Sequence, residues 1–331
     1  MSGATIEELV VISGKGGTGK TSLTASFAVL AGNAVLADCD VDAADLHLLL
    51  RPVVLERHEF RSGNEAAIRT EECVGCGICR EDCRFDAINV VRGANGRPKF
   101  TVDPLSCEGC GVCVRFCPVK AVSFPERVCG EWMVSETRCG PMVHARLGLA
   151  AENSGKLVAV VRREARRMAE ETGGGLIITD GPPGIGCPVI SSLTGASQAL
   201  VVTEPTVSGG HDLERVLALT RHFSVPTAVC VNKWDINPGM TERIEEMAVR
   251  AGSRLVGRIR YDGTVTTAQL QELAVVETDA PSTEDIRRVW NNLGLLKDLP
   301  TKDEVGDPGP DDVDALVAKK PAEKKQGKKS L

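Results

Sequence analysis

The stretch at residues 9–30 reads LVVISGKGGTGKTSLTASFAVL. A β-branched run comes first, a glycine-rich segment follows, and an Ala- and Leu-rich helical pattern completes it. The glycine-rich segment, Gly14-Lys15-Gly16-Gly17-Thr18-Gly19-Lys20-Thr21, fits the G-x-x-x-x-G-K-[ST] template in full. Glycines at these positions let backbone N–H groups wrap a phosphate at the N-terminus of the following helix. A chance glycine-rich turn would not need a strand before it and a helix after it, so we expect a phosphate-binding loop.

The remaining chain predicts an α/β fold. Ala34 to Asp38 forms a second apolar run, and the runs LIITD, ALVVTEP, TAVCVN and LVGRIRYD follow later, separated by helical patterns. Buried strands that alternate with helices imply a mainly parallel sheet with helices on both faces. We therefore expect a P-loop NTPase sheet, in which Lys20 contacts the β- and γ-phosphates of a nucleotide and Thr21 ligates Mg²⁺.

Cysteines interrupt this pattern. The chain has 331 residues and 13 cysteines, and eight of these fall in two runs with one spacing. The runs are Cys73, Cys76, Cys79 and Cys83, then Cys107, Cys110, Cys113 and Cys117. This internal repeat predicts a small α+β insert at residues 55–126 that splits the ATPase domain into residues 1–54 and 127–299. Residues 300–331 are rich in Pro, Asp and Lys, and we expect them to be disordered.

The pattern K-G-G-T-G-K-T, with its additional Lys15, resembles the deviant Walker motif of the MinD, ParA and nitrogenase iron-protein superfamily. The resemblance implies an ATPase dimer in which Lys15 reaches the partner's phosphates. It also implies that Asp40 orients the attacking water and that Asp38 and Asp180 lie at Mg²⁺. An Asp at a strand end can instead cap a turn, and for Asp42 the two interpretations stay equally open.

Asn232 begins the segment N-K-W-D. In MinD-like proteins an Asn at this strand end contacts adenine, which favours ATP. The same four residues also resemble the N-K-x-D guanine reader, so the match at Asp235 keeps GTP open.

The two cysteine runs resemble those of bacterial two-cluster ferredoxins. This resemblance implies two [4Fe–4S] clusters, the first held by Cys73, Cys76, Cys79 and Cys117 and the second by Cys107, Cys110, Cys113 and Cys83. Zinc also binds four cysteines, but its structural sites use two separated C-x₂-C pairs. Arg84 stands where the ferredoxin pattern has proline. Among the other cysteines, we expect Cys39 and Cys230 in the core and favour buried packing for Cys187 over a bridge between subunits. The roles of Cys129 and Cys139 stay open.

The combination predicts a MinD-like ATPase, slow without a partner, that passes electrons through its clusters to a redox protein. The alternative is a carrier that delivers an iron–sulfur or metal cluster to a client. The ATPase dimer could be a homodimer or a heterodimer with a related ATPase. A net charge of −6 argues against nucleic-acid binding. The absence of a signal pattern and of long apolar runs predicts a cytoplasmic protein without a membrane partner.

Overall fold

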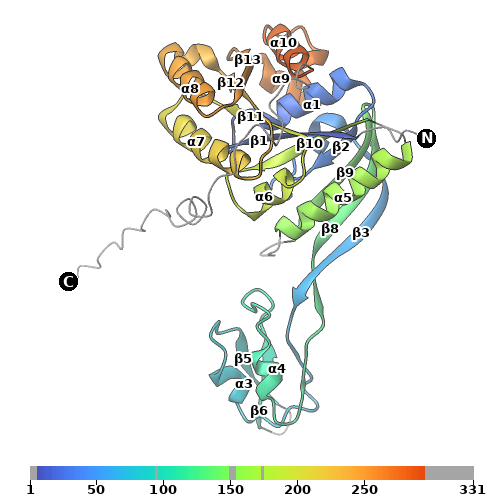
Figure 1. The fold of residues 1–331 in the computed structure, drawn as a ribbon. Helices are drawn as coiled ribbons and strands as arrows, with labels where there is room; N and C mark the ends of the chain where they lie inside the picture. Colours follow the sequence, from blue (N-terminus) through green and yellow to red (C-terminus); the bar gives the residue numbers. More distant parts are fainter. Residues whose placement is uncertain (1–5, 94–95, 149–153, 173–174, 295–331) are drawn as a thin grey trace, which may run out of the picture.

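A sheet of nine strands organises the computed structural model, which describes residues 6–93, 96–148, 154–172 and 175–294. Its strand order is β13-β12-β11-β1-β10-β2-β9-β8-β3 (Figure 1). The strands are β1 (Glu7–Ser13), β2 (Val35–Asp38), β3 (Val53–Asn64), β8 (Glu126–Thr137), β9 (Gly140–Leu147), β10 (Leu176–Pro183), β11 (Gln198–Thr203), β12 (Thr227–Asn232) and β13 (Arg254–Ile259). All pairs from β13 to β9 are parallel, which confirms the predicted mainly parallel sheet. Only the pairs β9–β8 and β8–β3 at one edge are antiparallel.

Helices cover both faces of the sheet. They are α1 (Lys20–Ala31), α2 (Leu46–Leu50), α5 (Ser154–Thr172), α6 (Cys187–Leu193), α7 (Val207–His222), α8 (Pro238–Arg250), α9 (Thr264–Leu270) and α10 (Thr283–Leu293), with 3-10 turns η1 (Trp234–Ile236) and η2 (Val275–Glu277). Residues 295–299, at the end of the predicted ATPase domain, and the tail at 300–331 lie outside the described residues. No helix in the described part of the chain is long and apolar enough to span a bilayer.

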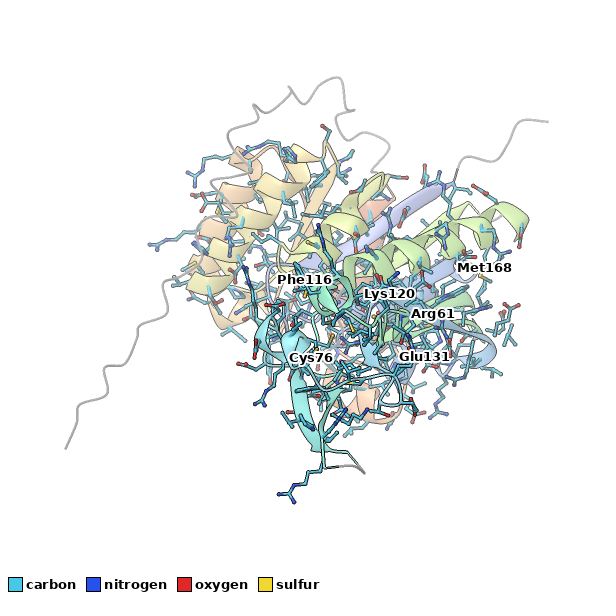
Figure 2. All side chains as sticks on the ribbon, turned by 90° about the horizontal axis from the view of Figure 1, so that it is seen from below. Arg61, Cys76, Phe116, Lys120, Glu131 and Met168 are labelled. Atoms are coloured by element: carbon cyan, nitrogen blue, oxygen red, sulfur yellow. The ribbon has the colours of Figure 1, made fainter. Side chains whose placement is uncertain are left out.

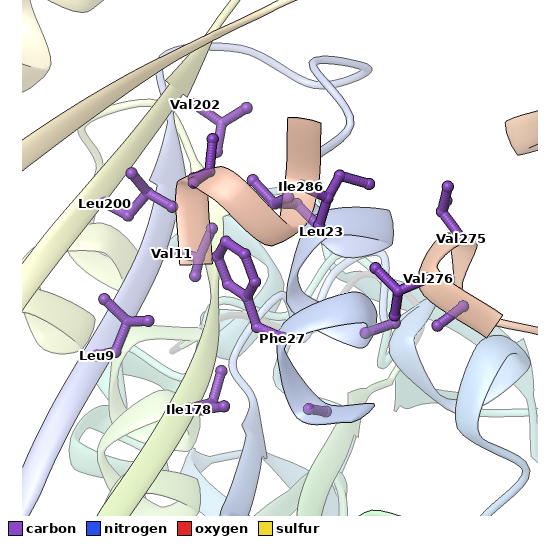
Figure 3. Close-up of a cluster of buried hydrophobic side chains, with 14 of the residues drawn as sticks. Leu9, Val11, Leu23, Phe27, Ile178, Leu200, Val202, Val275, Val276 and Ile286 are labelled. Carbon is purple, nitrogen blue, oxygen red and sulfur yellow. The ribbon is translucent and has the colours of Figure 1, made fainter. Parts of the chain in front are cut away.

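Alternate residues of β1 explain the two layers. Leu9 and Val11 lie in one buried cluster with Phe27 of α1, whereas Val10 and Ile12 lie in another with residues of α7. Successive side chains of a strand point to opposite faces, so a run of apolar residues fits a strand that is covered on both sides. Figure 3 shows Phe27 among strand side chains of the first cluster. Its ring lies 5.2 Å from that of Trp290 in α10. The phosphate-binding loop thus begins and ends on rigidly packed elements.

A two-stranded ribbon of β3 and β8 connects the sheet to a separate small unit (Figure 1). This unit contains β4 (Ala67–Ile68), α3 (Ile78–Glu81), β5 (Ile88–Arg92), β6 (Pro98–Val102), α4 (Val112–Phe116) and β7 (Val122–Ser123). The two halves of this unit, each with one cysteine run, adopt a similar backbone conformation after their last cysteine. At equivalent positions there, Asp86 and Lys120 have positive φ angles of 51° and 52°. β3 belongs to the large sheet and ends at Asn64. The boundary that we expect near residue 55 stays a prediction.

Candidate functional site

The phosphate-binding loop joins β1 to α1 through backbone angles that favour glycine. Gly17 has a φ of 79° and Gly19 a φ of 90°, both in the left-handed region. A Cβ atom at Gly19 would lie 2.4 Å from the side-chain nitrogen of Asn232. That nitrogen donates a hydrogen bond to the carbonyl oxygen of Thr18 at 2.8 Å. Asn232, at the end of β12, therefore holds the loop in place from the neighbouring part of the sheet.

Lys20 lies among carboxylates at the carboxyl ends of two strands. Its Nζ atom is 2.9 Å from Asp180 Oδ1 and 3.3 Å from Asp40 Oδ2. Thr21 donates its hydroxyl hydrogen to Asp180 Oδ2 at 2.8 Å. The register of β10 and β2 sets Asp180 opposite Asp38. The structure therefore brings together Lys20, Thr21 and the three predicted aspartates, whereas Asp42 is exposed.

The charges in this group do not balance. Asp38 is fully buried and accepts hydrogen bonds from the backbone N–H groups of Asp40 and Leu46. Burial, and then the charge of Asp180, raise the pKa of Asp38 well above its ordinary value. Burial also raises the pKa of Asp40. Burial alone would lower the pKa of Lys20, but Asp180 and Asp40 outweigh it and raise that pKa. One ammonium faces three carboxyl groups, an environment that favours an additional cation.

The donor set here suits Mg²⁺. Carboxylate and hydroxyl oxygens are its preferred ligands, and it keeps several waters, so one or two carboxylates are enough. Within the described ranges, no three carboxyl, imidazole or thiol side chains converge on one point as the ligands of a fully protein-bound ion would. Thr21, Asp38 and Asp180 fit a site that waters would complete.

A second cluster of charges lies at the rim of the loop. Lys15 Nζ is 2.5 Å from Glu204 Oε1, and Lys233 Nζ is 3.2 Å from the other oxygen of that carboxylate. Lys15 also donates to the hydroxyl groups of Thr206 and Ser208, at 3.3 and 3.1 Å. Burial alone would raise the pKa of Glu204, but the hydrogen bonds from the two lysines lower it. Sequence reasoning did not find Glu204, because it is distant from Lys15 in the chain.

A cavity of about 250 Å³ opens beside Gly19 and Asn232. Its other walls come from α1, from the loop after β13, from α9, from η2 and from the start of α10, and include Arg260, Tyr261, Thr266 and Ser282. Its volume suits a nucleobase beside the phosphate-binding loop. Sequence reasoning missed these lining residues. Asp235, the residue that kept guanine open, accepts a hydrogen bond from the backbone N–H of Tyr261 at 2.7 Å.

The eight cysteines of the repeat line two cavities. Cys73, Cys76, Cys79 and Cys117 line the first, and Cys83, Cys107, Cys110 and Cys113 line the second. Each cavity thus takes three cysteines from one run and the fourth from the other run, which is the pairing that the ferredoxin resemblance implies. Figure 2 labels Cys76 on this unit, where it is exposed, as is Cys110.

The cysteine loops fit iron–sulfur clusters in two respects. Gly75, Gly77, Gly109 and Gly111 all have positive φ, and a Cβ at Gly109 would lie 2.2 Å from the carbonyl oxygen of Asn64. The backbone N–H of Ala121 donates to Cys117 Sγ at 3.2 Å, and outer contacts of this kind orient a metal-ligating side chain. Burial, followed by the neighbouring Cys73 and Cys76, raises the pKa of Cys79 to about 11. Thiols in such surroundings ionise when bound metal supplies positive charge.

The remaining cysteines divide by exposure. Cys39, just after β2, and Cys230, in β12, are buried as expected, and Cys129 and Cys139 are buried as well. Cys187 is exposed at the start of α6, so the favoured prediction of buried packing is wrong. The glycines before it carry the chain to the surface after β10, and α6 buries its later residues Val189 and Leu193 instead.

Comparisons with known proteins bear first on the cysteine unit and then on the whole chain. Residues 66–124 match the family model of the 4Fe-4S dicluster domain. An uncharacterized protein of Methanocaldococcus jannaschii is 29% identical over 300 residues, which cover 87% of this chain and 96% of the relative. A second one from that organism is 23% identical over 240 residues, covering 69% and 81%.

Solved structures share the architecture of the large sheet. The cell division ATPase MinD of Pyrococcus furiosus has a TM-score of 0.52 at 17% identity, covering 88% of this chain and 99% of its own. MinD of Pyrococcus horikoshii, complexed with Mg-ADP, has a TM-score of 0.53 at 15% identity, with 89% and 98% covered. A ParA family ATPase from Chlorobium tepidum gives 0.51 at 16%, with 88% and 100% covered.

The chain has the MinD/ParA ATPase fold. This fold carries an iron–sulfur unit of the dicluster type between β3 and β8, as the sequence predicted. The match at residues 66–124 lies within the predicted insert and begins just after the ribbon strand β3 ends at Asn64.

Proposed function

We propose that this chain is an Mg²⁺-dependent ATPase that couples ATP binding and dimer closure to electron transfer through two [4Fe–4S] clusters. The observation that carries the proposal is the presence on one chain of two centres joined by a ribbon. One is the Lys20–Thr21–Asp180 group beside a base-sized cavity, and the other is the pair of four-cysteine cavities. A stand-alone ferredoxin would need no nucleotide site, and a simple ATPase would need no cysteine cavities.

In the nucleotide half, Lys20 and the loop N–H groups would bind the phosphates, while the cavity beside Asn232 would take the adenine. Thr21, Asp38 and Asp180 would hold Mg²⁺, which neutralises charge on the phosphates. Asp40, whose carboxylate lies 3.3 Å from Lys20 Nζ, would orient the attacking water. We favour ATP over GTP because Asn232 lines the base-sized cavity, whereas Asp235, the residue that would read guanine, is not among its lining residues. Turnover without a partner is expected to be slow.

In the dimer, Lys15 would reach the phosphates bound to the partner chain. A cation that arrives from a second subunit stabilises the charge that develops during phosphoryl transfer. The second chain would be another copy of this chain or a related ATPase. It places the active state in the closed dimer, so ATP must bind that state more tightly than the open one.

Two ion pairs support coupling between the halves. Arg51, just before β3, pairs with Glu272, and Arg138, in the turn between β8 and β9, pairs with Glu277 at 2.5 Å. Both acidic residues follow α9, which lines the cavity proposed to hold the adenine. If α9 moves when nucleotide binds, these ion pairs would transmit the movement to β3 and β8 at the end of the ribbon that lies in the large sheet.

In the insert, each set of four cysteines would hold one cluster, and the clusters would supply one-electron chemistry at low potential. The partner would be a redox protein. A second candidate function is a carrier that delivers a cluster to an accepting protein. One observation favours it: Cys76 and Cys110 are exposed, and an exposed ligand is open to exchange.

The test is the EPR spectrum and potential of the reduced protein, purified without oxygen, with and without Mg-ATP. A shift of either quantity with all iron retained supports electron transfer. Loss of a cluster to a chelator or apo-acceptor on nucleotide addition would support the carrier and overturn the redox role. Lys20→Met, which removes the phosphate-binding lysine, is the control and should abolish any effect of ATP.

A further inference from the structure

The Lys15 ammonium makes three polar contacts within its own chain. Its ammonium contacts the Glu204 carboxylate at 2.5 Å and the hydroxyl groups of Thr206 and Ser208 at 3.3 and 3.1 Å. A lysine ammonium has three hydrogens to donate, and these three contacts use all of them. The side chains of Lys15 and Glu204 are 30% and 16% exposed, so the pair is partly shielded from water. Lys15 therefore cannot reach a partner's phosphate without breaking all three contacts.

The turn that receives Lys15 is firmly built. It lies between β11 and α7, and the Thr206 hydroxyl accepts the backbone N–H of Gly209 at 2.9 Å as the cap of α7. Thr203 donates its hydroxyl hydrogen to the Gly209 carbonyl oxygen at 3.1 Å. A Cβ on Gly209 would lie 2.3 Å from the carbonyl oxygen of Glu204, so the chain packs closely at this point. The backbone that carries the Glu204 carboxylate is thus held in place before Lys15 binds it.

Glu204 also has a second cation. Lys233 Nζ lies 3.2 Å from the carboxylate oxygen that Lys15 does not contact, and it donates to the carbonyl oxygen of Gly17 at 3.1 Å. When Lys15 leaves, Lys233 stays and keeps the half-buried carboxylate paired. Because an unpaired buried charge is costly, this arrangement lowers the cost of releasing Lys15.

We propose that Glu204 is a positioning residue that holds Lys15 within its own chain and releases it only when two nucleotide-loaded chains pair. This inference rests on the proposed trans role of Lys15. It predicts that Glu204 opposes dimer closure. It also predicts that, in the isolated chain, Lys15 stays bound to Glu204 and does not contact the nucleotide of its own chain. A partly exposed pair is worth about a threefold change in equilibrium. Two lysines are released per dimer, so the dimer dissociation constant should change about tenfold.

The experiment measures the dimer dissociation constant by sedimentation velocity with Mg²⁺ and a non-hydrolysable ATP analogue. Glu204→Gln should tighten the dimer about tenfold, and Ser208→Ala, which removes one neutral contact, should tighten it less. Glu214→Gln, the same charge change on the exposed side of α7, should leave it unchanged. An unchanged or weaker dimer in Glu204→Gln overturns the proposal, and Ser208→Ala provides the same test should Glu204→Gln fold poorly.

Two further variants separate this inference from the proposed function. In a Lys15→Gln background, Glu204→Gln should no longer change the dimer, whereas an effect that persists would overturn the inference by placing it elsewhere, for example at Lys233. If Lys15→Gln abolishes ATP hydrolysis but Glu204→Gln does not tighten the dimer, the trans role stands and the inference falls. If Lys15→Gln leaves hydrolysis and dimerisation unchanged, the trans role itself falls and the inference with it.

Discussion

Replacing Lys20 by methionine should destabilise the nucleotide-free protein, because the lysine neutralises a buried group of carboxylates. Lys20 is 6% exposed, and its partner Asp180 is fully buried at 2.9 Å. Asp40 lies 3.3 Å away, and Asp38 is a third carboxyl group that acts on Lys20. Methionine has similar length, so the change removes charge with little loss of packing. Breaking a buried ion pair by removing one partner costs about 3–5 kcal/mol.

The assay is thermal unfolding followed by tryptophan fluorescence, since Trp290 packs on Phe27 in the core beside the sheet. For a domain of this size each kcal/mol lowers Tm by about 2–4 °C, so we expect a drop on the order of 10 °C. Lys156→Met, at an exposed position of α5, is the matched control and should change stability by less than about 0.5 kcal/mol.

The effect should also depend on pH. Burial already raises the pKa of Asp38 and of Asp40, and loss of Lys20 would raise both further. A carboxyl group whose folded-state pKa lies above its unfolded value destabilises the protein at high pH, and the penalty fades as pH falls through the folded pKa. The difference between variant and wild type should therefore shrink toward acidic pH. A loss below about 1 kcal/mol at pH 7.5, or one that is constant with pH, would refute the reasoning.

Three other predictions concern the core, the clusters and one histidine. Phe27→Ala should cost about 3–5 kcal/mol of unfolding free energy, measured by urea denaturation, because the ring is fully buried; a cost near 1 kcal/mol would contradict this packing. Cys117→Ala should remove the first cluster and about half of the bound iron in a colorimetric assay, whereas Cys187→Ser should leave iron unchanged; equal losses would contradict the assignment. Burial lowers the pKa of His144 to about 4, and its ring lies 2.8 Å from the Ser135 hydroxyl. Because the unfolded chain takes up this proton near pH 6.5, wild type should lose about 1 kcal/mol relative to His144→Gln between pH 7 and 5.5, and parallel stability curves would contradict the shift.

The local motifs could be interpreted from sequence because their geometry depends on a few adjacent residues. The positive φ of Gly17 and Gly19 is a property of the loop itself, and the spacing of Cys73, Cys76 and Cys79 sets three thiols around one cavity. The apolar runs of the parallel strands were equally clear, since strands that are covered on both faces need continuous hydrophobic residues.

The antiparallel edge was not predicted. β8 and β9 alternate apolar and polar residues irregularly, and β3 is exposed along most of its length. Strands with solvent on one or both sides carry a weak sequence signal, because cross-strand partners decide their stability. The ribbon that carries the cysteine unit was therefore recognised only once β3 and β8 were seen to pair.

The sequence by itself determined the phosphate-binding loop, the mainly parallel sheet and the iron–sulfur unit, because each is written in short-range spacing or in runs of apolar residues. Only the tertiary structure decided that Glu204 contacts Lys15, that the loop after β13 and α9 line the cavity beside Gly19 and Asn232, and that Cys187 is exposed. These features join residues that are far apart in the chain. Their proximity follows from strand order and from which faces pack together, and no local pattern specifies either.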